Sequence, residues 1–277
     1  MNEASAPGAG IPADRAAALM APLTELVIRA GAAILAVDRA AMQVEGKADG
    51  SPVTEADLAA DRIIGEGLAR LVPELPALSE ERVHLAKLPY DGSFFLIDPL
   101  DGTKEYVAGR AEFTVNIALV CNGTPLLGII GAPALGLIWR GVVGRGAERL
   151  ALGAVPAAGP EPIHTRRHPP PGAPWVVAVS RSHGDARTEA FIEGRPGAVR
   201  KVLGSAVKFG RVAEGAADIY PRLSPTCEWD IAAGHAIVTA AGGRITDAYG
   251  AELQFGRDRK DFVVPGFIAW GDPAAAG

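Results

Sequence analysis

FFLIDPLDGT, residues 94–103, is the stretch from which the expected fold is built. Four apolar residues run without interruption into Asp98, which predicts a strand that is buried on both faces and ends at a carboxylate. Asp101 follows, and Gly102 and Thr103 then add a close backbone approach and a hydroxyl beside free N–H groups. Two neighbouring carboxylates repel each other unless a proton or a cation separates them, and backbone N–H groups suit phosphate. The stretch therefore indicates either a metal-assisted phosphoryl site or an Asp-rich turn without a ligand.

Length and composition predict a folded protein with two lobes. The chain has 277 residues, 48% of them hydrophobic, which is enough to bury one large core or two fused ones. Its net charge is −5 and it has no Lys/Arg-rich run, which argues against a nucleic-acid partner, while a basic pocket for a small anion stays open. With only two cysteines, a disulfide framework or a thiolate zinc site is not expected.

The same features predict a cytoplasmic protein. The N-terminus, MNEASAPGAGIPADR, carries acids and turn formers where a signal peptide needs a basic start and an apolar core. No later apolar run reaches the length of a membrane span, so we expect none, although peripheral association with the inner membrane stays open.

The first half of the chain predicts helices against a largely antiparallel sheet. Residues 1–13 are expected to be a disordered terminus and residues 14–152 an α+β metal-binding lobe. Apolar residues at helical spacing predict a helix over 19–34. Successive strands are predicted at 113–121, 126–130 and 137–143, the first two joined by a hairpin at Asn122-Gly123.

Two further acids lie at the ends of predicted elements. Thr54 with Asp57 resembles a capping box that starts a second helix, so Asp57 is either a first-turn acid that favours the helix dipole or a functional carboxylate. The short apolar run before Glu80 ends in an acid just as the strand before Asp98 does. If these two strands are neighbours in one sheet, Glu80, Asp98 and Asp101 come together as a set of hard oxygen ligands.

The second half of the chain predicts alternating strands and helices. Proline is densest in residues 153–174, which predicts a connection between the lobes, and residues 175–277 are expected to form an α/β substrate-binding lobe. Ligands in such folds bind beyond the carboxyl ends of the strands, where polar residues also collect here. These residues are Ser180 to His183, Gly204 and Ser205 with Lys208, and Arg222. Asp230 opens the last predicted helix, either as a dipole-stabilising acid or as another functional one.

Seven motifs in order along the chain resemble a known family. DGSPVTEAD at 49–57, LSEE at 78–81, LIDPLDGTKEY at 96–106 and WDIAAGHA at 229–236 are similar to the inositol monophosphatase superfamily of lithium-sensitive, magnesium-dependent phosphatases. SRSH at 180–183, GSAVKF at 204–209 and YPR at 220–222 resemble its 3′(2′),5′-bisphosphate nucleotidase branch. The likeness runs from about residue 20 to residue 268. It implies an α/β fold, a layered αβαβα sandwich of the type shared with fructose-1,6-bisphosphatase.

The resemblance also implies roles for single residues. Two or three Mg²⁺ ions, which hard oxygen ligands favour over zinc, would be held by Glu80, Asp98, the carbonyl of Leu100, Asp101 and Asp230. Asp57 and Thr103 would position or deprotonate the attacking water. Substrate contacts would come from Gly102, Thr103, His183, Ser205, Lys208, Arg222 and Asp230.

The expected activity is removal of the 3′-phosphate from adenosine 3′,5′-bisphosphate to give AMP, and action on its 5′-phosphosulfate relative, in sulfur metabolism. The partner is then a small nucleoside bisphosphate, and the protein is a monomer or homodimer. One alternative is a phosphatase of the same fold for inositol or histidinol phosphate, which would not need the charges of Lys208 and Arg222. Another is a catalytically silent metal or nucleotide sensor that keeps the acids as a binding cage.

Overall fold

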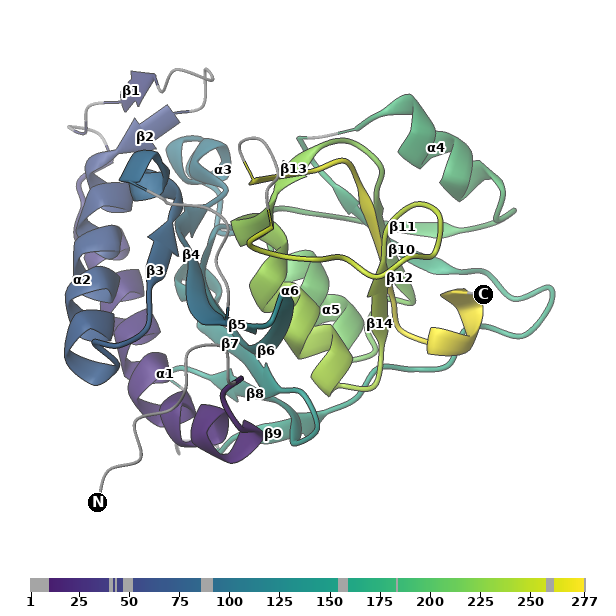
Figure 1. The fold of residues 1–277 in the computed structure, drawn as a ribbon. Coiled ribbons are helices and arrows are strands. Elements are labelled where there is room, and N and C mark those ends of the chain that lie inside the picture. The colour runs from purple at the N-terminus through teal and green to yellow at the C-terminus, as the bar shows by residue number, and fades with distance from the viewer. Residues whose placement is uncertain are drawn as a thin grey trace.

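The protein is built from helical layers that alternate with two sheets. The computed structural model describes residues 10–39, 42, 44–46, 52–85, 92–153, 159–182, 184–257 and 262–276. Its α-helices are α1 (Ala13–Ala36), α2 (Glu55–Leu71), α3 (Thr103–Val107), α4 (Ala186–Glu193), α5 (Val207–Ala213) and α6 (Glu228–Ala240). Helices α1 and α2 cover the first sheet, α5 and α6 lie between the two sheets, and α4 packs outside the second (Figure 1). The predicted layered α/β sandwich is confirmed.

Among the described residues, the first sheet has seven strands and the second has five. In spatial order the first contains β3 (Ala77–Ser79), β4 (Ser93–Asp101), β5 (Thr114–Cys121), β6 (Thr124–Ala132), β7 (Leu137–Val142), β8 (Gly146–Ala151) and β9 (Glu161–Ile163). The second contains β11 (Val199–Leu203), β10 (Val176–Ser180), β12 (Ile219–Arg222), β16 (Phe267–Trp270) and β14 (Arg244–Thr246). Two small ribbons join β1 (Val44–Gly46) to β2 (Pro52–Thr54) and β13 (Thr226–Cys227) to β15 (Val263–Val264).

Strand β4 is buried on both faces, as its apolar run predicts. Phe95 and Ile97 pack into the core under α1 and α2, while Phe94 and Leu96 pack on the other face into the core around α6. Strand β3 lies parallel to β4, with Ser79 opposite Ile97 in the register. The condition set out above, that these two strands are neighbours in one sheet, is therefore met, and it brings the segment that begins at Glu80 beside β4.

The two outer helices follow the predicted pattern. Helix α2 starts at Thr54, whose hydroxyl accepts a hydrogen bond from the Ala56 N–H, and a capping box is completed by Asp57. Helix α1 buries the stripe that includes Leu23 and Ile34 against the first sheet. With a mean hydropathy of 1.6, α1 is also long and apolar enough to cross a membrane, but a core helix passes the same test, so this is weak evidence for a span.

Three strands of the two large sheets, within the part of the chain that the structure describes, were missed by the sequence prediction, as were the four short strands of the small ribbons. Strands β8 and β9 extend the first sheet beyond the predicted meander, and β9 lies within the Pro-rich residues 153–174. Strand β16 enters the middle of the second sheet, antiparallel to both β12 and β14. Because β16 follows its neighbour β14 after a long segment without regular alternation, no local signal marks it as a central strand.

The middle layer is packed closely because small residues face one another there. A Cβ atom on Gly128 of β6 would lie 2.2 Å from the carbonyl oxygen of Ala233, and one on Gly234 would lie 2.2 Å from the ring of Phe209. The predicted close packing of the helix that begins near Asp230 is confirmed. This packing fixes the N-terminus of α6 beside the end of β4, which places Asp230 at the site described below.

His235 on α6 makes stability depend on pH. It is 8% exposed, and burial lowers the pKa of its imidazole to about 4, below the usual value of about 6.5. Below pH 6.5 His235 is therefore protonated in the unfolded chain but stays neutral in the folded chain. Because the unfolded state binds the extra proton, stability falls as the pH drops towards 4. Between pH 7.5 and 5 this amounts to about 2 kcal/mol. In His235→Gln, the free energy of unfolding should fall less over the same pH range, by about this amount, than it does in the wild type. Urea denaturation at the two pH values measures both falls. Equal losses in both proteins would contradict the burial of a neutral imidazole.

Candidate active site

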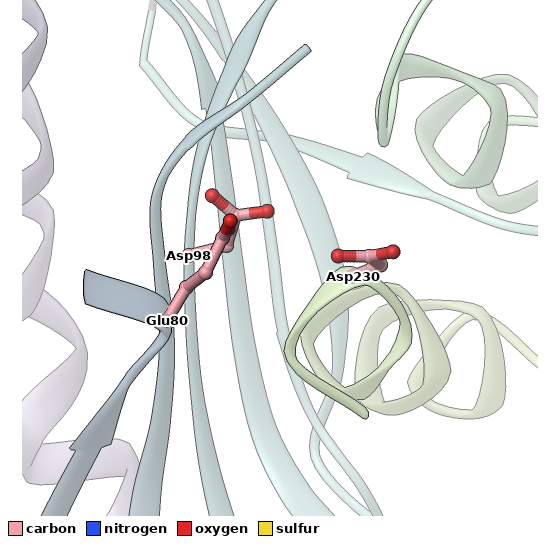
Figure 2. A group of neighbouring side chains, drawn as sticks. All are labelled: Glu80, Asp98 and Asp230. Atoms are coloured by element: carbon pink, nitrogen blue, oxygen red, sulfur yellow. The ribbon is translucent and has the colours of Figure 1, made fainter. Parts of the chain in front are cut away.

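Three carboxylates from different elements converge at one point. Glu80 directly follows β3, Asp98 lies on β4 and Asp230 lies in the first turn of α6, and one oxygen atom of each lies within 4.8 Å of the others. Figure 2 shows Glu80 and Asp98 extending from the first sheet on the side where Asp230 projects from the start of α6. Burial, together with repulsion from Glu80, Asp101 and Asp230, raises the pKa of Asp98 well above its usual value. Oxygen donors that repel one another in this way fit a divalent cation.

A bulge in β4 turns Asp101 towards the same side as Asp98. Residues three apart on a regular strand point to opposite faces, but here Asp98 pairs with Asn116 and Asp101 with Thr114, which are only two apart. Thr114 and Asn116 also lie within hydrogen-bond reach of Asp101 Oδ2, at 3.4 and 3.5 Å. Burial and the charge of Asp230 raise the pKa of Asp101 to about 6, against the lowering effect of Lys208 and Arg222.

Asp57 serves the helix cap and the site at the same time. Its Oδ2 accepts hydrogen bonds from the Thr54 N–H and hydroxyl at 2.8 and 2.6 Å, while its Oδ1 lies 3.1 Å from the Thr103 hydroxyl. That hydroxyl also lies 3.1 Å from the Leu100 carbonyl. Gly102 adopts a φ of +88°, which only glycine adopts without strain, and it lets the chain turn from β4 into α3. The two predicted readings of Asp57 are therefore compatible in one side chain.

Lys208 and Arg222 are cations that line the same cavity as the acids. Lys208 on α5 is 2% exposed and donates to the Ser205 carbonyl at 2.5 Å, and burial lowers the pKa of its ammonium group to about 8, so it is charged at neutral pH. Arg222, at the end of β12, donates to the Pro225 carbonyl at 3.2 Å. The cavity has a volume of about 170 Å³, and we call its walls at Glu80, Asp98, Asp101 and Asp230 the acidic end and its walls at Lys208 and Arg222 the cationic end. Its walls include Glu80, Asp98, Leu100, Asp101, Gly102, Thr103, Ser205, Lys208, Arg222 and Asp230.

All but two of the predicted site residues line this cavity. Asp57 reaches it through Thr103, and His183 lies outside the described residues. Sequence reasoning missed the aromatic wall formed by Phe209, Tyr220 and Phe267, whose ring centroids lie 5.0 to 5.3 Å apart. Phe267 is the first residue of β16, and because that strand was not predicted, its contribution to the cavity wall was not predicted either. The uninterrupted apolar run FIAW after Gly266 is a signal for a buried strand that could have found this residue, although it does not indicate the strand's central place in the sheet.

Comparison with known proteins agrees with this geometry. Residues 17–271 match the sequence model of the inositol monophosphatase family. The chain belongs to this family. It is 40% identical to the 3′(2′),5′-bisphosphate nucleotidase CysQ of Escherichia coli K12 over 252 residues, which cover 88% of this chain and 96% of that protein. The chain is 36% identical to the CysQ of Buchnera aphidicola, and the match covers 82% of this chain and 83% of that protein.

Solved structures give the same answer for the fold. The crystal structure of CysQ from Bacteroides thetaiotaomicron, described as a bacterial member of the inositol monophosphatase family, superposes with a TM-score of 0.70. It is 32% identical, and the match covers 90% of this chain and 96% of that one. The Thermotoga maritima IMPase superposes with a TM-score of 0.69 at 27% identity, covering 95% of this chain and 94% of that one. The predicted family and the predicted class of enzyme, a phosphatase, are both confirmed, and the acidic cluster fits the metal dependence of this family.

Proposed function

We propose that this phosphatase hydrolyses the 3′-phosphate of adenosine 3′,5′-bisphosphate to give AMP, and that it also acts on the 5′-phosphosulfate relative of that substrate. It would serve sulfur metabolism in the cytoplasm, as a monomer or homodimer. The observation that supports the proposal is that one cavity is lined both by the acidic cluster and by the cations Lys208 and Arg222. A substrate with two phosphates offers one to each end. The name printed for the curated relatives, 3′(2′),5′-bisphosphate nucleotidase, supports the same substrate.

The acidic end would hold two or three Mg²⁺ ions. The ligands would be Glu80, Asp98, the carbonyl of Leu100, Asp101 and Asp230, an all-oxygen set of the kind Mg²⁺ prefers. Bound metal ions would supply charge neutralisation at the phosphoryl group and a water of lowered pKa. A cation would bind favourably at this end of the cavity, because it would relieve the mutual repulsion of the carboxylates in the free protein.

Asp57 and Thr103 would handle the proton of the attacking water. The single hydroxyl hydrogen of Thr103 is directed at Asp57 Oδ1 or at the Leu100 carbonyl, so the lone pairs of the hydroxyl can accept a hydrogen bond from water. Asp57 is 1% exposed and ends this relay, so it would take up the proton as water adds to phosphorus. Attack in line with the departing ribose oxygen needs no covalent intermediate with the protein.

The opposite end would hold the phosphate that is not cleaved. Lys208 and Arg222 would neutralise it, while Gly102, Ser205, His183 and Asp230 would contact the nucleotide. A phosphatase for inositol or histidinol phosphate would leave the two cations unused, which is why we favour the bisphosphate over those substrates. A sensor that binds without turnover would keep the acids but would have no need of the relay from Thr103 to Asp57.

Lys208→Met tests this division of the cavity. Methionine fills nearly the same buried volume without the charge, so the fold should persist. A charge-assisted contact contributes about 1.5 to 3 kcal/mol, so kcat/KM for adenosine 3′,5′-bisphosphate should fall roughly ten- to a hundredfold. The loss on adenosine 3′-monophosphate should be much smaller, because that ester lacks the second phosphate. Steady-state kinetics on both esters gives the comparison, with Lys201→Met on exposed β11 as the control. Equal losses on the two esters would contradict the assignment of Lys208 to the second phosphate.

A further inference from the structure

Glu105 on α3 is a buried acid beside the cavity that the proposed reaction does not use. It is 3% exposed and lines the cavity wall. Its Oε1 accepts a hydrogen bond from the Ser182 hydroxyl at 2.5 Å, and its Oε2 accepts one from Arg110 at 2.7 Å. The guanidinium of Arg181 lies 3.6 Å from Oε2. Burial alone would raise the pKa of Glu105, but the hydrogen bonds from Ser182 and Arg110 and the charges of Arg110 and Arg181 lower it, so the carboxylate is ionised.

A second acid continues this network. Glu112, seven residues on, pairs with Arg181 and accepts a hydrogen bond from the Gly204 N–H at 3.1 Å. The acceptors Glu105 and Glu112 belong to the segment between β4 and β5, which directly follows Thr103. The donors Arg181, Ser182 and Gly204 directly follow β10 and β11 of the second sheet. The contacts of Glu105 therefore join the segment after Asp101 to the residues that follow β10, and the contact of Glu112 joins it to Gly204, directly before Ser205. The Arg181 N–H also donates to the Leu203 carbonyl at 3.2 Å, which links the ends of β10 and β11.

The two segments are also in close steric contact. A Cβ atom on Gly204 would lie 2.5 Å from the carbonyl oxygen of Glu112, and one on Gly102 would lie 3.1 Å from Ser205 Cβ. Ser205 has a φ of +39°, in the left-handed region that non-glycine residues rarely occupy, and its hydroxyl accepts a hydrogen bond from Thr114 at 3.3 Å. Such a conformation persists only where the surrounding contacts fix it. The turn before Lys208 is thus held directly on the turn between Asp101 and Thr103.

We propose that Glu105 is a positioning residue that fixes the separation between the acidic and cationic ends of the cavity, and thereby the selectivity for substrates with two phosphates. The inference rests on the proposed function. The two phosphates of a nucleoside bisphosphate are a nearly fixed distance apart, so both ends must be correctly spaced for both to be bound. A monophosphate ester needs only the acidic end. Loss of the contacts from Glu105 therefore weakens the bisphosphate more than the monophosphate.

Glu105→Ala tests this role through the ratio of kcat/KM for adenosine 3′,5′-bisphosphate to that for adenosine 3′-monophosphate. We expect the ratio to fall about tenfold, mainly through KM for the bisphosphate, because small misplacements of binding groups have effects of this size or more. Glu105→Gln keeps an acceptor for Ser182 and should recover part of the ratio. Ser182→Ala should lower the ratio in the wild-type background but not in the Glu105→Ala background, because both changes remove one contact. Glu148→Ala removes an ion pair with Arg140 outside the cavity lining and should leave the ratio unchanged.

The outcomes separate this inference from the proposed function. A wild-type protein without preference for the bisphosphate would overturn the proposed function, and the inference with it. A wild-type protein with that preference, whose ratio is unchanged in the Glu105 variants, would overturn the inference alone, as would equal losses on the two esters in a variant with a normal melting temperature. Should Glu105→Ala fail to fold, Glu105→Gln carries the test, with an expected loss of about threefold in the same ratio.

Discussion

Asp98→Asn and Asp101→Asn are each expected to abolish turnover and to weaken Mg²⁺ binding while the protein stays folded. Asp98 is repelled by Glu80, Asp101 and Asp230 and is 2% exposed, so a cation bound there would relieve repulsion among buried carboxylates. Loss of metal-assisted charge stabilisation removes several kcal/mol from the transition state, which is about a thousandfold or more in rate. Calorimetric titration with Mg²⁺, alongside turnover, measures both effects.

The metal-free forms of these variants give a second result. Replacing one carboxylate removes repulsion from a crowded cluster, so the melting temperature without Mg²⁺ should be equal to or above that of the wild type, while the gain on adding Mg²⁺ should disappear. Asp218→Asn, which alters a buried carboxylate that directly precedes β12 and pairs with Arg166, is the matched control and should keep the Mg²⁺ affinity of the wild type. Unchanged Mg²⁺ affinity in both Asp98→Asn and Asp101→Asn would contradict the assignment of these two residues as metal ligands.

Asp57→Asn is expected to lower kcat by about two or more orders of magnitude with little change in KM. Asparagine retains an oxygen that can accept from the Thr54 N–H, so the cap of α2 should survive, but the group at Oδ1 can no longer take up a proton through Thr103. Steady-state kinetics and thermal melting together separate the two roles. Asp247→Asn changes another carboxylate that caps backbone N–H groups, on a loop that does not line the cavity, and should leave kcat as it is. A near-normal kcat in Asp57→Asn would return that residue to the helix cap alone.

The parts of the site that follow from local rules could be predicted from the sequence. The apolar run before Asp98 predicted a buried strand, and Thr54 with Asp57 predicted the start of a helix. The predicted end of the strand at Asp98 was wrong, because β4 continues to Asp101. The similar way in which the two runs end in acids raised the neighbouring of β3 and β4 only as a condition, which their parallel pairing meets. Each of these patterns lies within about ten residues, where periodicity and capping rules apply.

The parts that depend on long-range packing could not be predicted. The bulge that turns Asp101 to the same side as Asp98 is set by pairing with Asn116 and Thr114, not by the residues of β4 alone. The position of β16 between β12 and β14 is a matter of topology. Glu105 reads as an ordinary first-turn acid in the sequence, because its partners Ser182 and Arg181 are more than seventy residues away along the chain. Side chains that join two sheets leave no periodic signal in either segment.

Turnover of adenosine 3′,5′-bisphosphate in the presence of Mg²⁺ tests the central claim most directly. The account predicts that kcat/KM for this substrate exceeds that for inositol 1-phosphate and for histidinol phosphate by at least about tenfold, the contribution of one charge-assisted contact to the second phosphate. It also predicts that the nucleotide product is adenosine 5′-monophosphate, identified by chromatography, with one phosphate released per molecule. Preference for either monophosphate ester, release of the 5′-phosphate instead, or tight binding of the bisphosphate without turnover would contradict it.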